Sequence, residues 1–382
     1  WISVSFRITP CGDNQSILSG PGWGFLVKCR HNKNSLKYLV QGDYEKRCGK
    51  MSDLNLAVLR FSHPLAFRAY LKERGAPVDG YFRRQGLPTL CDDPGAFVPL
   101  SKAWRFYGDA AQREDPHLGW QVGHFVGDNR LSGSLLKKLE RAPTLYQALQ
   151  RFCRLINSEV SYIRMGILER RSDVLFYSHF PYFGSQHGYL VSQGYQLAVV
   201  IDVIRHFAGR NWAPAEIGTQ GGGEATTVQA RYPHSRIKLN QPFGYISIPR
   251  SHLHRDLCKP HRIDQTEEQL VWAENMDYAQ LLELLLEPYL QKGYPSMNIA
   301  ASLMDQSTRT VARRLAECGT SYQTLVDSLR YRKATDLLNN TDMPISEVAW
   351  CVGFDDQSNF GRMFRRNAGV SPLQFRRINS IS

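Results

Sequence analysis

No stretch of this 382-residue chain stays apolar over the roughly 18 residues that a helix needs to cross a lipid bilayer. The first seven residues lack the basic flank and long apolar core of a signal peptide. None of the eight cysteines forms a Cys-x-x-Cys pair, and their wide spacing does not suggest a disulfide scaffold. We therefore expect a cytoplasmic protein with reduced thiols and no membrane partner.

The short motifs on which many enzymes depend are also missing. The chain has no nucleophile elbow, no paired-carboxylate motif and no glycine-rich nucleotide loop. This absence predicts a protein that binds rather than catalyses and that needs no cofactor. A length of 382 residues with 42% hydrophobic and 21% charged residues allows two or three ordinary globular domains.

Acidic residues are absent from the end of the chain. From Gln357 to the C-terminus there are five arginines and no Asp or Glu, a one-sign surface that favours a polyanion. The net charge of the whole chain is +12, yet residues 266–382 hold 12 Lys and Arg against 14 Asp and Glu. An argument for nucleic-acid binding therefore depends on local clustering of arginine and not on total charge.

The stretch 345–377 has the pattern of two short helices around a tight turn. Ile345, Val348, Ala349 and Val352 form one apolar stripe, and Gly353 is suited to end that helix. A second apolar stripe comprises Phe360, Met363 and Phe364. The other face of the second helix carries Gln357, Ser358, Asn359, Arg362, Arg365 and Arg366. These features predict a helix-turn-helix, and the alternative is a charged surface helix that binds nothing.

The spacing of this stretch adds a resemblance to a known family. It looks like the second helix-turn-helix of the AraC/XylS family of bacterial transcription regulators. The matching positions are Ile345, Val348-Ala349, Gly353-Phe354, Ser358, Phe360, Arg362, Phe364-Arg365, Gly369, Ser371-Pro372 and Phe375-Arg376. The resemblance implies a regulator, most often an activator, that binds promoter DNA and RNA polymerase and responds to a small-molecule effector.

A second copy of the motif precedes it. Ala300, Ala301 and Met304 face inward on its first predicted helix, and Ser307 is placed to cap the second. The outward face of the second helix carries Thr308, Arg309, Ala312 and Arg313. The turn Asp305-Gln306 departs from the family, in which a Gly and an apolar residue are usual. The helix predicted over 325–338 would connect the two motifs.

DNA contacts are assigned from this resemblance and from side-chain chemistry. Arg pairs bidentately with guanine, and Gln or Asn with adenine. Base reading is therefore expected from Arg309 and Arg313 in the first motif and from Gln357, Ser358, Asn359 and Arg362 in the second. Arg365 and Arg366 are better placed for phosphates, and the predicted DNA-binding set also includes Ser307, Thr308 and Ala312.

Residues 51–258 alternate helix and strand patterns. Helices are expected at 68–75, 101–113 and 190–207, and another opens at Ala142-Pro143-Thr144 with Pro143 in its first turn. Strands are expected at 162–168, 174–180 and within 237–248. The region resembles the non-cupin sensor domain of one AraC subgroup. The matching positions are Gly86-Leu87-Pro88, Asp115 to Gly119, Ala142 to Leu145 and Gln241-Pro242-Phe243.

The expected architecture is an α+β sensor, a linker at 259–277 and an all-α DNA-binding domain at 278–382 with two helix-turn-helix motifs joined by a connecting helix. A homodimer formed through the sensor is also expected.

Residues 1–50 differ from the rest of the chain. They are basic and show little apolar periodicity, whereas an ordinary apolar pattern begins after Met51. We interpret them as a disordered or non-native extension upstream of a native start at Met51. The alternative is a genuine basic N-terminal arm, and mass spectrometry of the native protein distinguishes the two.

Four metal-competent side chains lie close together before the linker. They are His252, His254, Cys258 and His261, and their spacing matches no standard zinc finger. A hydrophilic connector is the preferred interpretation, and a metal- or redox-responsive regulator is the alternative. The effector itself is unknown from the sequence, although Tyr162, Phe176, Tyr177, Tyr182 and Phe183 are aromatic candidates for its pocket or for the core.

Overall fold

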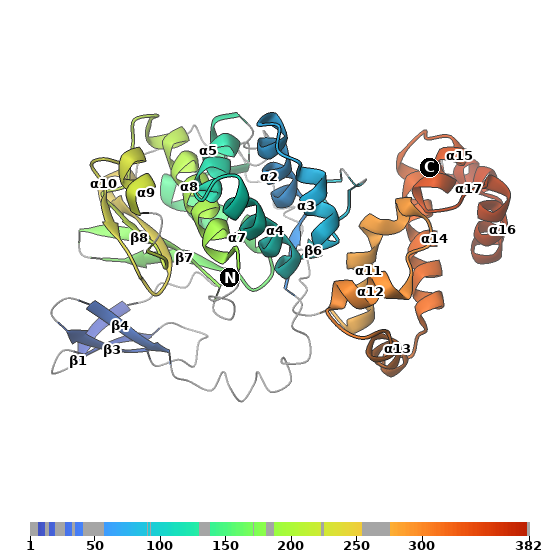
Figure 1. The fold of residues 1–382 in the computed structure, drawn as a ribbon, viewed down its shortest axis with the longest axis horizontal. Helices are drawn as coiled ribbons and strands as arrows, with labels where there is room; N and C mark the ends of the chain where they lie inside the picture. Colours follow the sequence, from blue (N-terminus) through green and yellow to red (C-terminus); the bar gives the residue numbers. More distant parts are fainter. Residues whose placement is uncertain are drawn as a thin grey trace. The chain divides into compact units, whose positions relative to one another are not determined.

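A computed structural model describes residues 57–253 and 276–379, with gaps at 90, 92, 130–137, 171, 181–186 and 223–224, and the backbone of four strands between residues 7 and 40. In Figure 1 the helices and strands are coloured by their position in the sequence, from blue at the N-terminus to red at the C-terminus. The chain divides into two compact units, Trp1–Asn55 with Trp104–Leu270 and Leu56–Ala103 with Val271–Ser382. The N-terminal part is α+β and everything described after Asp277 is helical, which confirms the predicted fold class.

The N-terminal strands form an antiparallel meander. The sheet order is β1-β2-β3-β4. The strands are β1 (Arg7–Cys11), β2 (Gln15–Ser19), β3 (Val27–Asn32) and β4 (Ser35–Val40). Strand pairing says nothing about where translation begins, so the proposed start at Met51 stays a prediction.

The first unit contains a five-stranded sheet, in the order β10-β9-β11-β8-β7. Its strands are β7 (Arg164–Glu169), β8 (Asp173–His179), β9 (Glu216–Gly218), β10 (Arg236–Lys238) and β11 (Gly244–Pro249). Neighbouring strands are antiparallel except β9 and β10. The two strands expected within 237–248 are present, but they do not pair with each other because β9 lies between them.

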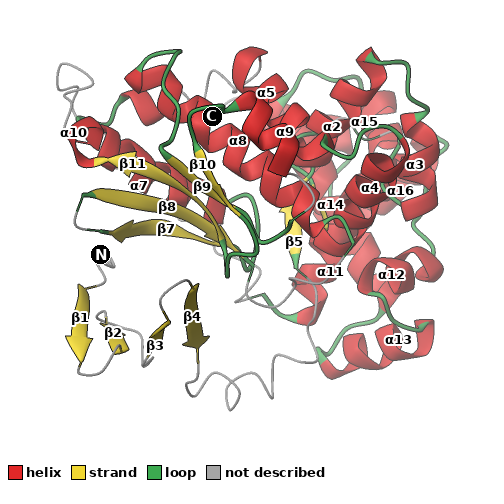
Figure 2. Cartoon of the chain, turned by 60° about the vertical axis from the view of Figure 1, so that its left-hand side comes forward, coloured by secondary structure: helices red, strands yellow, loops and turns green. Residues whose placement is uncertain are grey.

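Helices cover one face of this sheet, as Figure 2 shows for α7 and α8. The helices of this unit are α4 (Leu100–Arg113, which begins in the second unit), α5 (Leu118–Asn129), α7 (Leu145–Asn157), α8 (Tyr189–Ala208), α9 (Ala225–Arg231) and α10 (Arg250–Leu253). The helix expected to open at Ala142-Pro143-Thr144 is present, but it begins at Leu145 and Pro143 is not in its first turn. Thr144 is its N-cap and accepts from the Gln147 amide at 3.3 Å, so Pro143 precedes the helix.

Helix α5 was not predicted, because glycines break its helical pattern. Gly119, Gly123 and Gly127 all face α8, and a Cβ at Gly119 would lie 2.0 Å from the Val191 carbonyl oxygen. Glycine is therefore needed here for close packing of two backbones. A buried polar chain joins the same helices: His124 Nδ1 lies 2.7 Å from Asp202 Oδ2, and Tyr232 Oη lies 2.8 Å from His124 Nε2.

The second unit joins an early segment of the chain to the C-terminal helices. The early elements are β5 (Val58–Arg60), paired with β6 (Phe97–Pro99), and the helices α2 (Ser62–Glu73) and α3 (Val78–Gln85). Tyr289 donates to the Gly86 carbonyl at 2.6 Å, and Lys102 donates to Ser302 Oγ and the Gln85 carbonyl, both at 3.1 Å. This grouping differs from the domain boundaries expected from the sequence, which stay predictions.

The C-terminal helices pack around buried apolar stripes. They are α11 (Tyr278–Leu286), the 3₁₀ helix η1 (Glu287–Lys292), α12 (Met297–Met304), α13 (Thr308–Glu317), α14 (Tyr322–Asn340), α15 (Ile345–Cys351), α16 (Gln357–Ala368) and α17 (Pro372–Asn379). The stripe Leu281, Leu282, Leu285 and Leu286 is at most 2% exposed, so it belongs to the core. Within the described residues, no helix combines the length and apolarity required to cross a membrane.

Candidate nucleic-acid interface

The first helix-turn-helix comprises α12 and α13. Ser307 caps α13 and accepts from the Thr310 amide at 3.2 Å, as predicted. Asp305 adopts a left-handed conformation with φ +51° at the end of α12, where glycine is favourable. The turn is nonetheless closed, because the Gln306 amide donates to the Ala301 carbonyl at 2.9 Å and Tyr278 donates to Gln306 Oε1 at 2.8 Å. The unusual Asp305-Gln306 pair is thus accommodated.

Helix α13 separates a buried face from a polar one. Val311 and Leu315 are fully buried against the other helices. Arg313 forms an ion pair with Glu317 one turn later, with NH1 2.5 Å from Oε1. The predicted contact residues of this motif are all exposed, and they lie at the N-cap or in the first two turns of α13: Ser307, Thr308, Arg309, Ala312 and Arg313.

The second helix-turn-helix comprises α15 and α16, with Gly353 in the turn. Gly353 has φ +78°, and a Cβ there would lie 2.5 Å from the Leu290 carbonyl oxygen. Only glycine meets both requirements, since other residues rarely adopt this conformation. The predicted helix end is confirmed, with the last helical residue at Cys351.

A buried arginine of the connecting helix α14 fixes this turn. Arg330 is 6% exposed, and its Nε donates to the Val352 carbonyl at 2.7 Å. Its NH2 donates to the Gly353 carbonyl, and its guanidinium lies 3.5 Å from the centre of the Phe354 ring. The cation thus satisfies carbonyls at the end of α15, where the helix dipole is negative. Sequence reasoning placed Arg330 on the connector but missed this role, which no spacing reveals.

Helix α16 buries Phe360, Met363 and Phe364 in one cluster. All predicted contact residues of this motif lie on its exposed surface: Gln357, Ser358, Asn359, Arg362, Arg365 and Arg366. Arg366 NH2 lies 3.7 Å from Asp327 Oδ2 on α14, a solvent-exposed pair that contributes little stability. The six side chains are therefore accessible for a partner.

Asp356 caps α16 and begins a chain of contacts along that surface. Its Oδ1 accepts from the Asn359 amide at 2.7 Å, and its Oδ2 accepts from the Asn359 side-chain nitrogen. Asn359 Oδ1 in turn accepts from Arg362 NH2 at 2.5 Å. Asn359 and Arg362 were predicted as separate base-reading residues, and the structure brings them together.

A surface cavity of about 530 Å³ opens beside the start of α16. It is lined by Gly293, Tyr294, Arg330, Gly353, Phe354, Asp355, Asp356, Asn359, Arg362, Met363 and Arg366. The lining includes two aspartates and three arginines, so the cavity carries a small excess of positive charge. An anionic surface such as a DNA backbone suits this rim.

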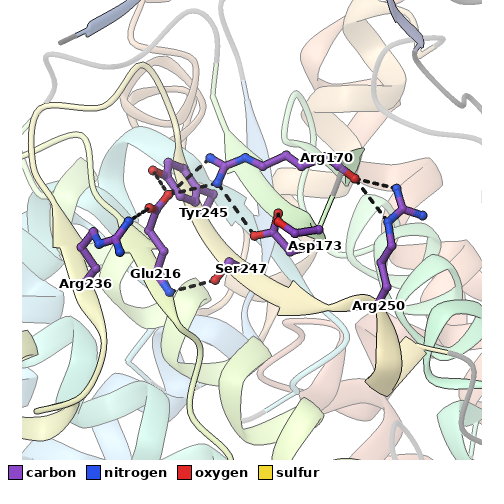
Figure 3. A network of polar contacts seen from close by, with 8 residues as sticks. Arg170, Asp173, Glu216, Arg236, Tyr245, Ser247 and Arg250 are labelled. Carbon is purple, nitrogen blue, oxygen red and sulfur yellow. Dashed lines mark hydrogen bonds and ion pairs between the residues drawn. The ribbon is translucent and has the colours of Figure 1, made fainter. Parts of the chain in front are cut away.

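The first unit carries a polar network that links its strands (Figure 3). Glu216 Oε1 accepts from Arg170 NH1 at 3.2 Å and from the Tyr245 hydroxyl at 2.8 Å. Arg236 NH1 lies 3.7 Å from Glu216 Oε2. Burial and the bond to Glu216 raise the pKa of Tyr245, so its hydroxyl stays a donor. The network ties β9 to β10, β11 and the β7–β8 turn, which is a stabilising arrangement.

The aromatic candidates for an effector pocket do not share one setting. Phe176 is fully buried and packs against Phe152 with ring centres 6.1 Å apart, so it belongs to the core. Tyr162 and Tyr177 are half-buried. The other two candidates, Tyr182 and Phe183, lie outside the described residues.

The weak metal candidates are mostly outside the described residues as well. His254, Cys258 and His261 fall in the segment 254–275. His252 lies on α10, with its Nδ1 3.4 Å from Ser251 Oγ. Across the described part of the chain, no group of three His, Cys, Asp or Glu side chains is arranged to hold a metal ion.

Two parts of the chain match the models of known protein families. Residues 75–257 match the family model of the arabinose-binding domain of AraC transcription regulator, N-terminal, and residues 300–378 match that of a helix-turn-helix domain. The chain is 32% identical over 145 residues to the ornithine utilization regulator of Pseudomonas aeruginosa, covering 36% of this chain and 43% of that protein.

Two further relatives are HTH-type transcriptional regulators. VqsM of Pseudomonas aeruginosa is 35% identical over 97 residues, which cover 25% of this chain and 30% of that protein. VirS of Mycobacterium tuberculosis is 23% identical over 341 residues, which cover 85% of this chain and 98% of that protein. The matches to the ornithine utilization regulator and VqsM thus span less than half the length of those proteins.

Proposed function

This chain belongs to the AraC family of transcription regulators, and on that premise we propose that it reads promoter DNA with two recognition helices under the control of a small molecule. The membership confirms the resemblance found in the sequence. The observation that carries the proposal is the pairing of α13 and α16. Each is capped at its N-terminus, buries an apolar face and exposes arginine beside small polar side chains. Such helices enter the major groove in helix-turn-helix proteins.

The proposed contacts divide by chemistry. Arg309, Arg313 and Arg362 are assigned to guanine edges, because the guanidinium fork matches O6 and N7. Gln357, Ser358 and Asn359 are assigned to base edges next to Arg362. Arg365 and Arg366 are assigned to phosphates, which position the domain without reading sequence. Ser307, Thr308 and Ala312 complete the surface, with the Ala312 methyl available to a thymine methyl.

Regulation is assigned to the sensor. An effector controls DNA binding only if it binds one conformational state better than another. We propose activation through contact with RNA polymerase, action in the cytoplasm where chromosomal DNA lies, and a homodimer formed through the sensor. The named relatives are transcription regulators, in agreement with the expectation that the chain is not an enzyme.

Redox control through two of the described thiols is disfavoured. Burial raises the pKa of the Cys153 thiol to about 12. Burial, followed by the nearby Glu347 charge, also raises the pKa of Cys351. A thiol reacts as its thiolate, so both side chains are poorly reactive near neutral pH.

Genome-wide footprinting of the tagged chain tests the proposal. We expect discrete protected sites, each with two segments about one helical turn apart, as two recognition helices in one chain require. A control variant, Arg210→Ala, removes an exposed arginine of the sensor, outside the two recognition helices. It should leave the footprint unchanged. If the protected sites shared no common sequence, the proposal of sequence-specific recognition would be wrong. If they share one, the genes beside these sites would narrow the chemical class of the effector.

A further inference from the structure

The N-cap of α16 differs from the serine caps of α12, α13 and α14. Ser296, Ser307 and Ser321 cap α12, α13 and α14, each with a single hydroxyl oxygen. Asp356 caps α16 with a carboxylate, which has a second oxygen beyond the one that capping uses. That second oxygen accepts from the side chain of Asn359. The cap therefore makes a contact that helix capping alone does not require.

The amide of Asn359 is oriented by opposite charges on its two sides. Its nitrogen faces the Asp356 carboxylate, and its Oδ1 accepts from Arg362 NH2 at 2.5 Å. A flipped amide would place oxygen against the carboxylate and the NH₂ group against the guanidinium, so one orientation is strongly preferred. Residues 356, 359 and 362 are spaced by three, which places them along one face of the helix start.

The chain of contacts restricts Arg362 before DNA arrives. A free arginine has many rotamers, and binding through it must order them. The contact uses one hydrogen of NH2, so Nε, NH1 and the second NH2 hydrogen remain available as donors. Asn359, in contrast, already uses its oxygen and one amide hydrogen, the two groups that pair with adenine. We therefore replace the base-edge assignment of Asn359 by a supporting role for Arg362.

We propose that Asp356 and Asn359 are positioning residues that hold Arg362 ready to read a guanine, so that Asp356 sets base preference through Arg362. The inference rests on the proposed DNA-reading function. It also adds to the predicted set, since Asp356 was not among the residues singled out in the sequence. A carboxylate at a DNA-facing surface repels phosphate, and capping of α16 together with this positioning role accounts for the presence of Asp356 there.

Asp356→Asn in the full-length chain tests the proposal. Asparagine caps helices as well as aspartate, but its side-chain NH₂ would face the NH₂ of Asn359 and break the contact. DNA duplexes are first selected from a randomised library by the wild-type chain. The base pair read by Arg362 is then identified as the position at which Arg362→Ala relaxes preference. At that base pair we expect Asp356→Asn to lower the preference for guanine by about tenfold.

The matched control is Asp355→Asn, which removes the same charge from the neighbouring exposed residue. Both variants should bind all DNA somewhat more tightly, since each removes a charge that repels phosphate. Only Asp356→Asn should alter base preference, and it should add nothing in an Arg362→Ala background. Thermal unfolding should match the wild type, because the cap is retained.

Two results would overturn the inference. In the first, Asp356→Asn keeps the wild-type base preference while the chain remains folded. In the second, Arg362→Ala relaxes no base pair, although the wild-type chain still selects a sequence. A wild-type chain that selects no sequence would instead refute the proposed function itself, so the two failures are distinguishable.

Discussion

At the scale of single residues, the buried guanidinium of Arg330 fixes the turn between α15 and α16. A buried charge is costly unless it is fully hydrogen-bonded. Here the two carbonyls of Val352 and Gly353 and the ring of Phe354 provide its partners. The arrangement joins the connecting helix to the turn that sets the direction of α16.

Arg330→Lys tests this role. Lysine keeps the charge but cannot donate to both carbonyls in the planar geometry of the guanidinium fork. We expect a loss of about 1–3 kcal/mol in the free energy of unfolding, measured in urea, because buried acceptors are left unpaired. Arg332→Lys on the exposed face of the same helix is the control and should change stability by less than about 0.5 kcal/mol. Equal stabilities of the two variants would contradict the account.

Some roles of single residues could be predicted from the sequence, and others could not. The apolar stripes identified α15 and α16, and residue type identified the exposed surface that is proposed to contact DNA. The support of Arg362 by Asp356 and Asn359 depends on rotamers, which spacing alone does not determine. Arg330 was visible as a charge on a helix, but its burial depends on the tertiary packing of the turn around it.

At the scale of elements, prediction succeeded where the apolar period was clear and failed where another constraint dominated. Helix α8 and the strands β7 and β8 have strong patterns, and all three are present as expected. Helix α5 has three glycines that lower helix propensity by up to about 1 kcal/mol each. Its packing against α8 overrides that propensity, and a single sequence does not show the partner.

The turn of the first helix-turn-helix offers an element-scale prediction. Asp305 has φ +51°, and its charge lies at the negative end of the α12 dipole. Asp305→Gly should therefore raise the free energy of unfolding by about 0.5–1 kcal/mol. Asp305→Asn removes the charge alone and should give part of the gain. Thermal unfolding of the three chains checks the order, and a glycine variant less stable than the wild type would contradict it.

At the scale of the whole molecule, the distribution of charge matters more than its total. The chain carries +12, yet residues 266–382 hold more acidic than basic residues. Recognition is therefore assigned to the few arginines exposed on α13 and α16. The fold confirms the α+β and all-helical parts, whereas the joining of residues 56–103 to the C-terminal helices was not foreseen. That grouping depends on contacts between residues far apart in the chain, such as Lys102 and Ser302, which are 200 positions apart.

The central claim is that α13 and α16 read two different segments of one DNA site. The most direct measurement compares base preference at every position of a selected duplex for Arg309→Ala, Arg362→Ala and the control Arg210→Ala. We expect each of the first two variants to lose about 1–3 kcal/mol of discrimination in one segment only. The two segments should be about one helical turn apart, and the control should match the wild type. Uniform weakening at all positions, or relaxation of the same base pair by both variants, would contradict the claim.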